Sequence, residues 1–226
     1  MLRYLAKIYT ITIKDLRSEA RTKELTPGML VFALIVVVVF NFAFEPGLRS
    51  REVLAAGILW VAFAFAGMLG LARTFAAEQE QEALKGLRLA PIDRSAIYLG
   101  KLQSNLIFLL GVEMISLVAF GVFFNIDLVS ILPRLAVVVL LGTLGFVAVG
   151  TLYAAVAANA HLREVMLPIL FFPIVIPVLI AGVKATGLVL KGKIFADMQS
   201  WITLLAAYDV VFIVVGILTF EYVIAD

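Results

Sequence analysis

The chain has 226 residues, of which 63% are hydrophobic and 15% are charged, and its formal net charge at pH 7 is +2. A soluble domain carries about 25% charged residues and could not bury this much apolar surface in a chain of this length. The composition therefore excludes an ordinary soluble protein, and the long unbroken apolar runs indicate spanning helices rather than barrel strands.

The opening segment, 2–22, is too charged to cross a membrane but has the pattern of an amphipathic helix. At 100° per residue, one arc holds Leu2, Leu5, Tyr9, Thr12, Ile13 and Leu16, with Ile8 at its edge. The opposite arc, within roughly 80°, holds Arg3, Lys7, Lys14, Arg17 and Arg21. We interpret 2–22 as an interfacial helix whose basic face lies on lipid headgroups. The alternative is a solvated helix with no special role.

Six later segments are long and apolar enough to cross about 30 Å of hydrocarbon. The predicted spans are about 28–44, 53–76, 103–124, 132–157, 165–183 and 202–224. The fifth contains three prolines, which kink a helix and are tolerated where neighbouring helices cover the gap. Lysine and arginine number 12 on one predicted face and 6 on the other, which predicts that both termini are cytoplasmic.

The longest soluble-looking stretch, about 77–101, lies between the second and third spans. Its glutamates suit the first turns of a short helix, Leu84 and Leu87 share one face, and Pro91 ends that helix. Such a helix can transmit force from a partner to two spans; the alternative is a solvated connector. The candidate contact residues, including those of the short loop after the fourth span, are Glu78, Glu80, Glu82, Leu84, Leu87, Arg88, Pro91, His161, Arg163 and Glu164.

Three charged residues fall in or at the ends of predicted spans. Glu113 is in the middle of the third span, Asp209 is about a third of the way into the sixth, and Arg134 opens the fourth. Charged groups in a bilayer are costly and commonly functional. A proton path, a gate, an interhelical ion pair and a buried hydrogen-bond anchor are all open interpretations.

No site for a cofactor or nucleotide is evident. The single histidine, His161, falls in a loop, and the methionines are scattered, so the pattern does not indicate a haem site. Gly187 begins a partial match to a phosphate-binding loop, but Ile194 stands where serine or threonine would hold magnesium. We therefore expect no catalytic, cofactor-binding or metal-binding residues in this chain.

Two motifs carry a resemblance to a known family. "ALKGLRLAPIDRSAIYLGK" resembles the first long cytoplasmic loop of the haem exporter protein B family, the CcmB-type permeases of cytochrome c maturation. "LPILFFPIVIPVLIAG" resembles its second, proline-spaced motif, and "LARTF" before the loop also fits. The resemblance covers essentially the whole chain. Glu82 and Lys85 depart from some relatives, which have glycine and an acidic residue there, so charge pairing with a partner would differ.

The resemblance implies an all-α polytopic membrane protein, 1–226, with six spans and an N-terminal elbow helix, similar to type-2 ABC exporters. It implies a permease subunit, not an enzyme, in the bacterial inner membrane, with ATP bound by a partner and haem as the substrate of the complex. The implied partners are an ABC ATPase subunit, a second copy of this chain, a haem-handling membrane subunit, a small single-span subunit, a haem chaperone and membrane lipid, with no nucleic acid. The 77–101 loop would then be the coupling helix that enters a groove of the ATPase.

Other functions stay open. One is a type-2 ABC exporter permease for a lipid or glycan. Another, of a different class, is an ion-coupled carrier that uses Glu113 and Asp209, which would show inverted repeats that we do not find in this sequence. The last is a passive scaffold.

Overall fold

Helices account for all regular structure in the part of the chain that the computed structural model describes, namely residues 2–23, 26–43, 51–80, 93–158 and 163–225. Within these ranges the side chains of 2, 51, 73–80, 158, 163–166 and 224–225 are not described. The all-α expectation is confirmed for this part of the chain. In hydrocarbon, a helix satisfies its own backbone hydrogen bonds, which an open strand cannot do.

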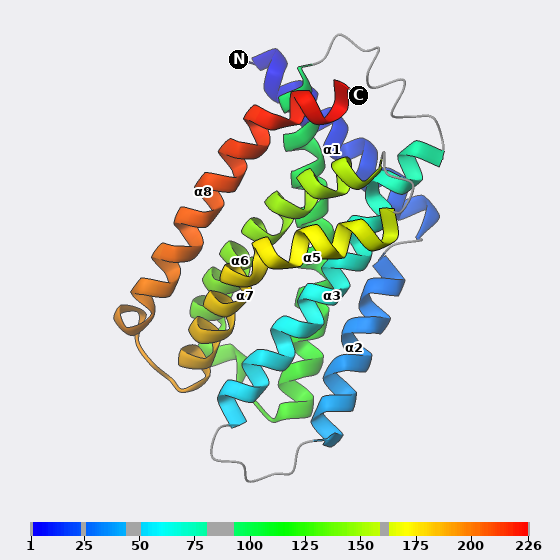
Figure 1. Ribbon diagram of the computed structural model, residues 1–226. Helices are drawn as coiled ribbons and strands as arrows, with labels where there is room; N and C mark the ends of the chain where they lie inside the picture. The colour runs from blue at the N-terminus through cyan, green and yellow to red at the C-terminus, as the bar shows by residue number, and fades with distance from the viewer. Residues whose placement is uncertain (1, 24–25, 44–50, 81–92, 159–162, 226) are drawn as a thin grey trace.

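The described helices follow one another along the chain as Figure 1 labels them. They are α1 Leu2–Thr22, α2 Thr26–Ala43, α3 Arg51–Glu80, α5 Arg94–Phe124, α6 Leu128–Ala158, α7 Arg163–Leu190 and α8 Phe195–Ala225. Six of them, α2 to α8, are long and apolar enough to span a membrane. The predicted six spans and the N-terminal helix are therefore confirmed.

Most spans begin earlier than the hydropathy pattern predicts. The largest difference is at α5, which begins at Arg94, so residues 94–101 are its first two turns and not part of the loop predicted over 77–101. The polar residues of 94–101 lower its hydropathy, but several of them find partners on neighbouring helices. Helices of 28–31 residues are about 42–46 Å long, more than the hydrocarbon thickness, so their polar ends extend beyond it.

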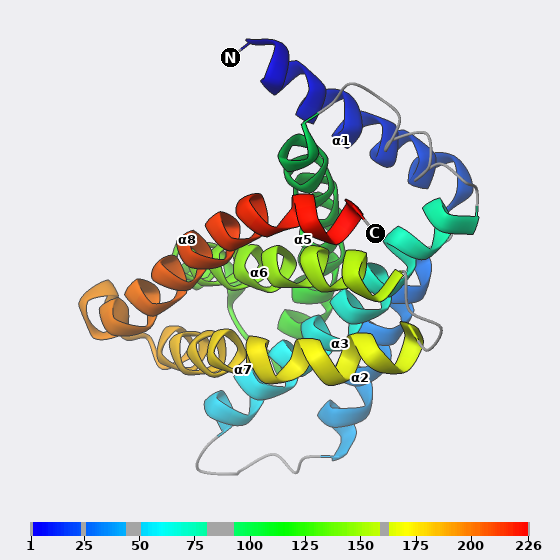
Figure 2. The same cartoon turned by 45° about the horizontal axis from the view of Figure 1, so that its top comes forward.

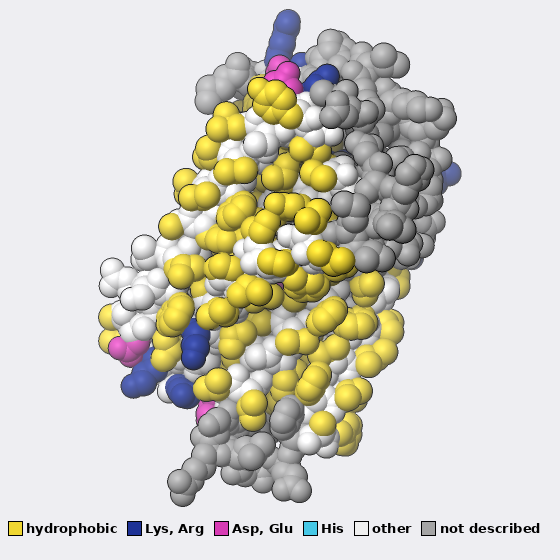
Figure 3. Space-filling view, viewed as in Figure 1, with side chains coloured by type: hydrophobic (Ala, Val, Ile, Leu, Met, Phe, Trp, Pro, Cys, Tyr) yellow, Lys and Arg dark blue, Asp and Glu magenta, His cyan; other side chains and the backbone are white. Residues whose placement is uncertain are grey.

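The central helix of the bundle is α6, which packs against α3, α5, α7 and α8. On one side α2 packs against α3 and α5, while α8 closes the other side (Figure 1). Figure 2 shows α1 lying outside the bundle across the end of α5, which is the helix it contacts most. Hydrophobic side chains cover most of the face shown in Figure 3, and charged ones gather toward its ends, as a bilayer requires.

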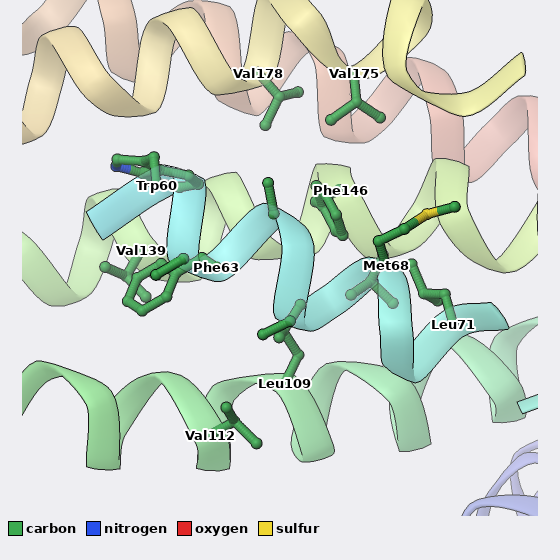
Figure 4. Packing of buried hydrophobic residues seen from close by; sticks show 14 of the residues in the cluster. Trp60, Phe63, Met68, Leu71, Leu109, Val112, Val139, Phe146, Val175 and Val178 are labelled. Carbon is green, nitrogen blue, oxygen red and sulfur yellow. The ribbon is translucent and has the colours of Figure 1, made fainter. Parts of the chain in front are cut away.

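The core is organised around Trp60 of α3. Its ring lies against Gly142 of α6 and Gly182 of α7, where any Cβ atom would overlap it. Its indole Nε1–H donates a hydrogen bond of 2.9 Å to Thr186 Oγ1 on α7. Figure 4 shows Trp60 on α3 with other buried apolar side chains of the core, which come from α3, α5, α6 and α7. Lipid tails are as apolar as leucine, so close packing of this kind is what holds spanning helices together.

We predict that Gly142→Ala lowers the thermal stability of the purified protein in detergent. The added methyl group must displace the Trp60 ring, and overpacking of this kind costs about 1–3 kcal/mol. The matched control is Gly111→Ala on α5, where a Cβ atom meets nothing within 4 Å, and its unfolding temperature should be unchanged or slightly higher. Equal unfolding temperatures for the two variants would contradict the role given to Trp60.

Candidate functional site

A row of polar contacts joins α1 to the first turns of α5; we call it the α1–α5 seam. Tyr4 Oη lies 3.0 Å from Ser95 Oγ, and Thr12 Oγ1 lies 3.2 Å from the carbonyl oxygen of Gly100. Gly100 has no side chain, so Ile11 packs directly over it. The seam thus fixes α1 along α5 over two turns, directly after the residues that connect α3 to α5.

The strongest contact of the seam is a buried ion pair. Lys101 Nζ lies 2.9 Å from Asp15 Oδ2, and the two side chains are 2% and 10% exposed. Ser104 Oγ donates a 3.2 Å hydrogen bond to the same Asp15 oxygen. Lys14 also pairs with Asp15, at 3.2 Å, but its side chain is 46% exposed. Removing one partner of a buried pair leaves an uncompensated charge, so the Lys101–Asp15 pair constrains α1 and α5 far more than the Lys14 pair does.

A second acidic residue of α1 caps the next helix. Glu19 is buried, and its Oε1 accepts hydrogen bonds of 2.8 Å from both the backbone N–H and the hydroxyl of Thr26, the first residue of α2. A carboxylate at a helix N-terminus satisfies free backbone donors and interacts favourably with the helix dipole. As a result, α1 is joined to α5 by its seam and to α2 by its C-terminal part.

The sequence pattern divides α1 into two arcs, one apolar and one basic, and these contact residues do not stand out in it. In the structure α1 has a third arc, which faces the protein. The arc that faces the protein contains Ile11, Thr12, Asp15 and Glu19, and by the sequence pattern Thr12 falls in the apolar arc. The available signal is that Asp15 and Glu19 are the acidic residues of α1 and lie four positions apart, on one helix face. Leu5 is exposed on the apolar arc, which leaves that arc available for lipid.

The basic arc faces away from the protein. Four of its predicted interfacial residues are exposed and Lys7 is partly exposed: Arg3, Lys7, Lys14, Arg17 and Arg21. This placement leaves them accessible to headgroups, and the contact itself stays a prediction.

The predicted coupling residues lie outside the described side chains. Those outside the described residues altogether are Glu82, Leu84, Leu87, Arg88, Pro91 and His161. The others fall within α3 or α7, although their side chains are not described: Glu78, Glu80, Arg163 and Glu164. Directly after the loop, Arg94 Nη1 donates a 2.9 Å hydrogen bond to the carbonyl oxygen of Glu221 on α8, so the start of α5 is joined to α8 as well as to α1.

Glu113 links two spans within the membrane. It is fully buried on α5, and its Oε1 and Oε2 lie 2.9 and 2.7 Å from Thr143 Oγ1, near the middle of α6. A hydroxyl has one proton, so it can donate to one carboxyl oxygen at a time. The geometry favours a hydrogen-bond anchor, and among the described residues Glu113 has no ion-pair partner.

Asp209 differs from Glu113 in having no partner. It lies near the middle of α8, because that helix begins at Phe195 rather than near 202, and only 3% of its surface is exposed. Its carboxyl group packs over Gly145 of α6, and neither oxygen has a hydrogen-bond partner among the described residues. The neighbouring Tyr208 donates instead to the carbonyl oxygen of Ile174 on α7, at 2.8 Å. A buried polar group left without a partner is costly, which favours a functional role over an anchor.

Arg134 lies six residues into α6, near the end of the bundle opposite the termini. Its Nη1 donates a 2.6 Å hydrogen bond to the carbonyl oxygen of Lys193 in the turn between α7 and α8. Arg134 is thus far from Glu113 and Asp209 along the bundle axis, and the three do not form one site. In the part of the chain that the structure describes, no group of three or more His, Cys, Asp or Glu side chains could hold a metal ion.

Comparisons with known proteins agree with one another. A family model described as CcmB protein matches residues 6–225. The chain is 30% identical over 190 residues to heme exporter protein B of Bradyrhizobium diazoefficiens, covering 83% of each protein. It is also 30% identical over 198 residues to the protein of that name from Paracoccus denitrificans, covering 87% of this chain and 88% of that protein.

We predict that Lys101→Met destabilises the protein by about 3–5 kcal/mol, because it leaves the buried Asp15 with only the exposed Lys14 as a cationic partner. The double variant Asp15→Leu with Lys101→Met should recover most of this loss, and Lys14→Met should cost under about 1 kcal/mol. Thermal unfolding in detergent measures all three. A Lys101→Met effect no larger than that of Lys14→Met would show that the pair does not hold α1 in place.

A second prediction separates the anchor from the proton-path interpretation of Glu113. Glu113→Gln keeps a side chain that can hydrogen-bond to Thr143, so stability and transport activity should both be retained. Thr143→Val removes the partner and should lower stability by about 1–3 kcal/mol. Loss of transport in a stably folded Glu113→Gln protein would instead show that an ionisable group is required.

Proposed function

The chain belongs to the CcmB protein family, and from that membership we propose that it is the membrane-spanning permease subunit of an ABC transporter for haem export. The single observation that carries the proposal is the family match over nearly the whole chain. The six candidate spans and the N-terminal helix are compatible with a type-2 ABC exporter fold. ATP hydrolysis then belongs to a separate ATPase subunit.

In this proposal the ATPase acts on two cytoplasmic loops, one between α3 and α5 and one between α6 and α7. The contacts around the first loop would transmit a force applied by the ATPase to several helices. Displacement of the start of α5 would carry α1 with it, because Lys101 and Asp15 are paired, and α1 would carry the start of α2 through Glu19 and Thr26. The Arg94 bond to α8 adds a fourth helix to the elements that move together.

The proposed location is the bacterial inner membrane, with both termini in the cytoplasm. The excess of lysine and arginine on the terminal side supports this orientation. Lys101 contributes less than its position suggests, since it is buried in an ion pair, but the excess remains without it.

The proposed assembly contains two copies of this chain, because one six-span subunit forms half of an exporter. The further partners are a haem-handling membrane subunit, a small single-span subunit and a haem chaperone, whose release the complex would drive. Haem would be the substrate of the whole complex. The chain's one histidine lies outside the described residues, so no haem ligand set is assigned to this subunit.

One observation favours a second candidate function, an ion-coupled carrier. Asp209 is buried near the middle of α8 without a partner, as a proton-carrying or ion-binding carboxylate would be in one state of a transport cycle. Replacing it with asparagine tests this candidate, because a carrier that uses Asp209 would lose transport. Transport retained in a stably folded Asp209→Asn protein would exclude the carrier and leave the ABC permease.

We predict that the tagged chain, extracted from its native host in mild detergent, co-purifies with an ABC ATPase subunit. Leu84→Asp and Leu87→Asp should release the ATPase or abolish its stimulation, because a charge would replace an apolar contact in the proposed coupling helix. Subunit identification by mass spectrometry and ATPase assays measure these effects.

The matched control for the loop variants is Ile194→Asp, which introduces the same charge at an exposed position in the turn between α7 and α8, at the other end of the bundle. It should leave ATPase binding unchanged. Purification of the chain without any ATPase, at every detergent strength tried, would contradict the ABC assignment.

A further inference from the structure

A cleft opens at the end of the bundle opposite the two termini, and we call it the far-end cleft. Its volume is about 430 Å³, within the range of small-molecule sites. It lies between the start of α3, the start of α6 and the turns that follow α5 and α7. The rest of its described lining is glycine and apolar side chains, and its polar lining residues are Glu52, Asn125, Asp127, Ser130 and Arg134.

Both turns that line the cleft have the same local structure. Asn125, directly after α5, and Gly192, two residues after the end of α7, adopt left-handed conformations with φ of 52° and 71°. In each turn the next backbone N–H reaches back five residues, from Ile126 to Gly121 at 2.9 Å and from Lys193 to Leu188 at 3.0 Å. These are Schellman motifs, which asparagine and glycine favour. They bring two helix C-termini, each with partial negative charge, to the cleft.

The second turn also orients the cationic group of the cleft. The Schellman motif leaves the carbonyl oxygen of Lys193 available, and it accepts the 2.6 Å hydrogen bond from Arg134 Nη1. A guanidinium has five N–H donors, and among the described residues Arg134 makes no other bond. Its remaining donors are therefore available to an anionic ligand.

Two carboxylates supply the opposite charge. Glu52 has no ion-pair partner among the described residues. Asp127 Oδ1 accepts a 3.2 Å hydrogen bond from the Val129 backbone N–H, which leaves its second oxygen available. Among the described residues, the cleft thus presents one guanidinium, two carboxylates and two helix C-termini, a set that fits a ligand carrying both an anion and a cation.

The depth of the cleft indicates the source of such a ligand. If α6, about 46 Å long, is centred on a hydrocarbon layer of about 30 Å, it extends about 8 Å beyond each side. Arg134 is about 9 Å from its start, at the edge of the hydrocarbon, and its long side chain can extend outward to the level of the lipid phosphates. Val129 and Leu132 are exposed on the same turns of α6, so apolar surface for acyl chains is present at this level.

We propose that the far-end cleft binds the head group of a zwitterionic phospholipid with a primary ammonium, of the phosphatidylethanolamine class. Arg134 binds the phosphate, and Glu52 and Asp127 bind the ammonium. A purely anionic lipid is disfavoured because it has no cation to pair with the two carboxylates. A lipid with a quaternary ammonium is disfavoured because that group has no N–H to donate to them. The site is independent of the proposed export function.

Native mass spectrometry of the detergent-purified chain tests the proposal with dioleoyl lipids at equal concentrations. We expect one molecule of the phosphatidylethanolamine to bind about tenfold more tightly than phosphatidylglycerol or phosphatidylcholine, as expected for one or two charge-assisted hydrogen bonds. Arg134→Gln and Glu52→Gln should each weaken that binding about tenfold. Glu52 is exposed, so its variant tests the site even where Arg134→Gln impairs folding.

Matched controls make the same charge changes at the same end of the bundle but outside the cleft. Lys191→Gln and Asp197→Asn, both exposed, should leave binding unchanged. Equal binding of the three lipids, or equal weakening by the control variants, would overturn the proposal. So would equally tight binding of soluble glycerophosphoethanolamine, which would show a free ligand rather than a lipid. A partner chain cross-linked in native membranes through a cysteine at Ser130 would assign the cleft to a protein contact instead.

Discussion

The insertion of the Trp60 ring between two glycines is the interaction on which the bundle depends. A bilayer offers no hydrophobic driving force between helices, so spanning helices associate through close packing and buried hydrogen bonds. Trp60 provides both, because its ring fills the space left by Gly142 and Gly182 and its indole donates to Thr186. One side chain of α3 thereby holds α6 and α7, and α6 in turn contacts α5 and α8.

The buried polar groups form a second layer of organisation. Each would be costly alone in hydrocarbon, and most are therefore paired across two helices. Glu113 with Thr143 joins α5 to α6 within the membrane, while Lys101 with Asp15 joins α5 to α1 at its edge. Asp209 is the exception among the described residues, since neither of its oxygens has a partner. The other buried carboxyl groups of the described residues have hydrogen-bond or ion-pair partners. The free-energy cost of burying Asp209 without one makes it a candidate for a role in transport.

The two ends of the bundle differ in how their helices are connected, and this difference suits different roles. At the end with the termini, an ion pair joins α5 to α1, a helix cap joins α1 to α2, and a hydrogen bond joins α5 to α8, all next to the loop proposed to contact an ATPase. Movement there would be shared among several helices. At the opposite end, two Schellman turns leave charged side chains around an open cleft. Helices such as α5 and α7 run between the two ends, so a displacement at one end has a continuous path to the other.

The class, the number of spans and the amphipathic first helix could all be predicted from the amino-acid sequence, because hydrophobicity reports how deep a residue lies in a bilayer and backbone hydrogen bonding then requires a helix. The family could be predicted too, through motifs spread along the chain.

Which helices are neighbours could not be predicted from the sequence. These helices are apolar on nearly every face, so no periodic pattern distinguishes a side that faces lipid from one that faces protein. The hydropathy pattern also places Lys101 in a loop and gives Asp15 and Glu19 no special role, because the partners that allow these charged groups to be buried are brought to them only by the tertiary structure. The far-end cleft likewise depends on turns whose residues are distant in sequence, and their meeting follows from packing rather than from local preference.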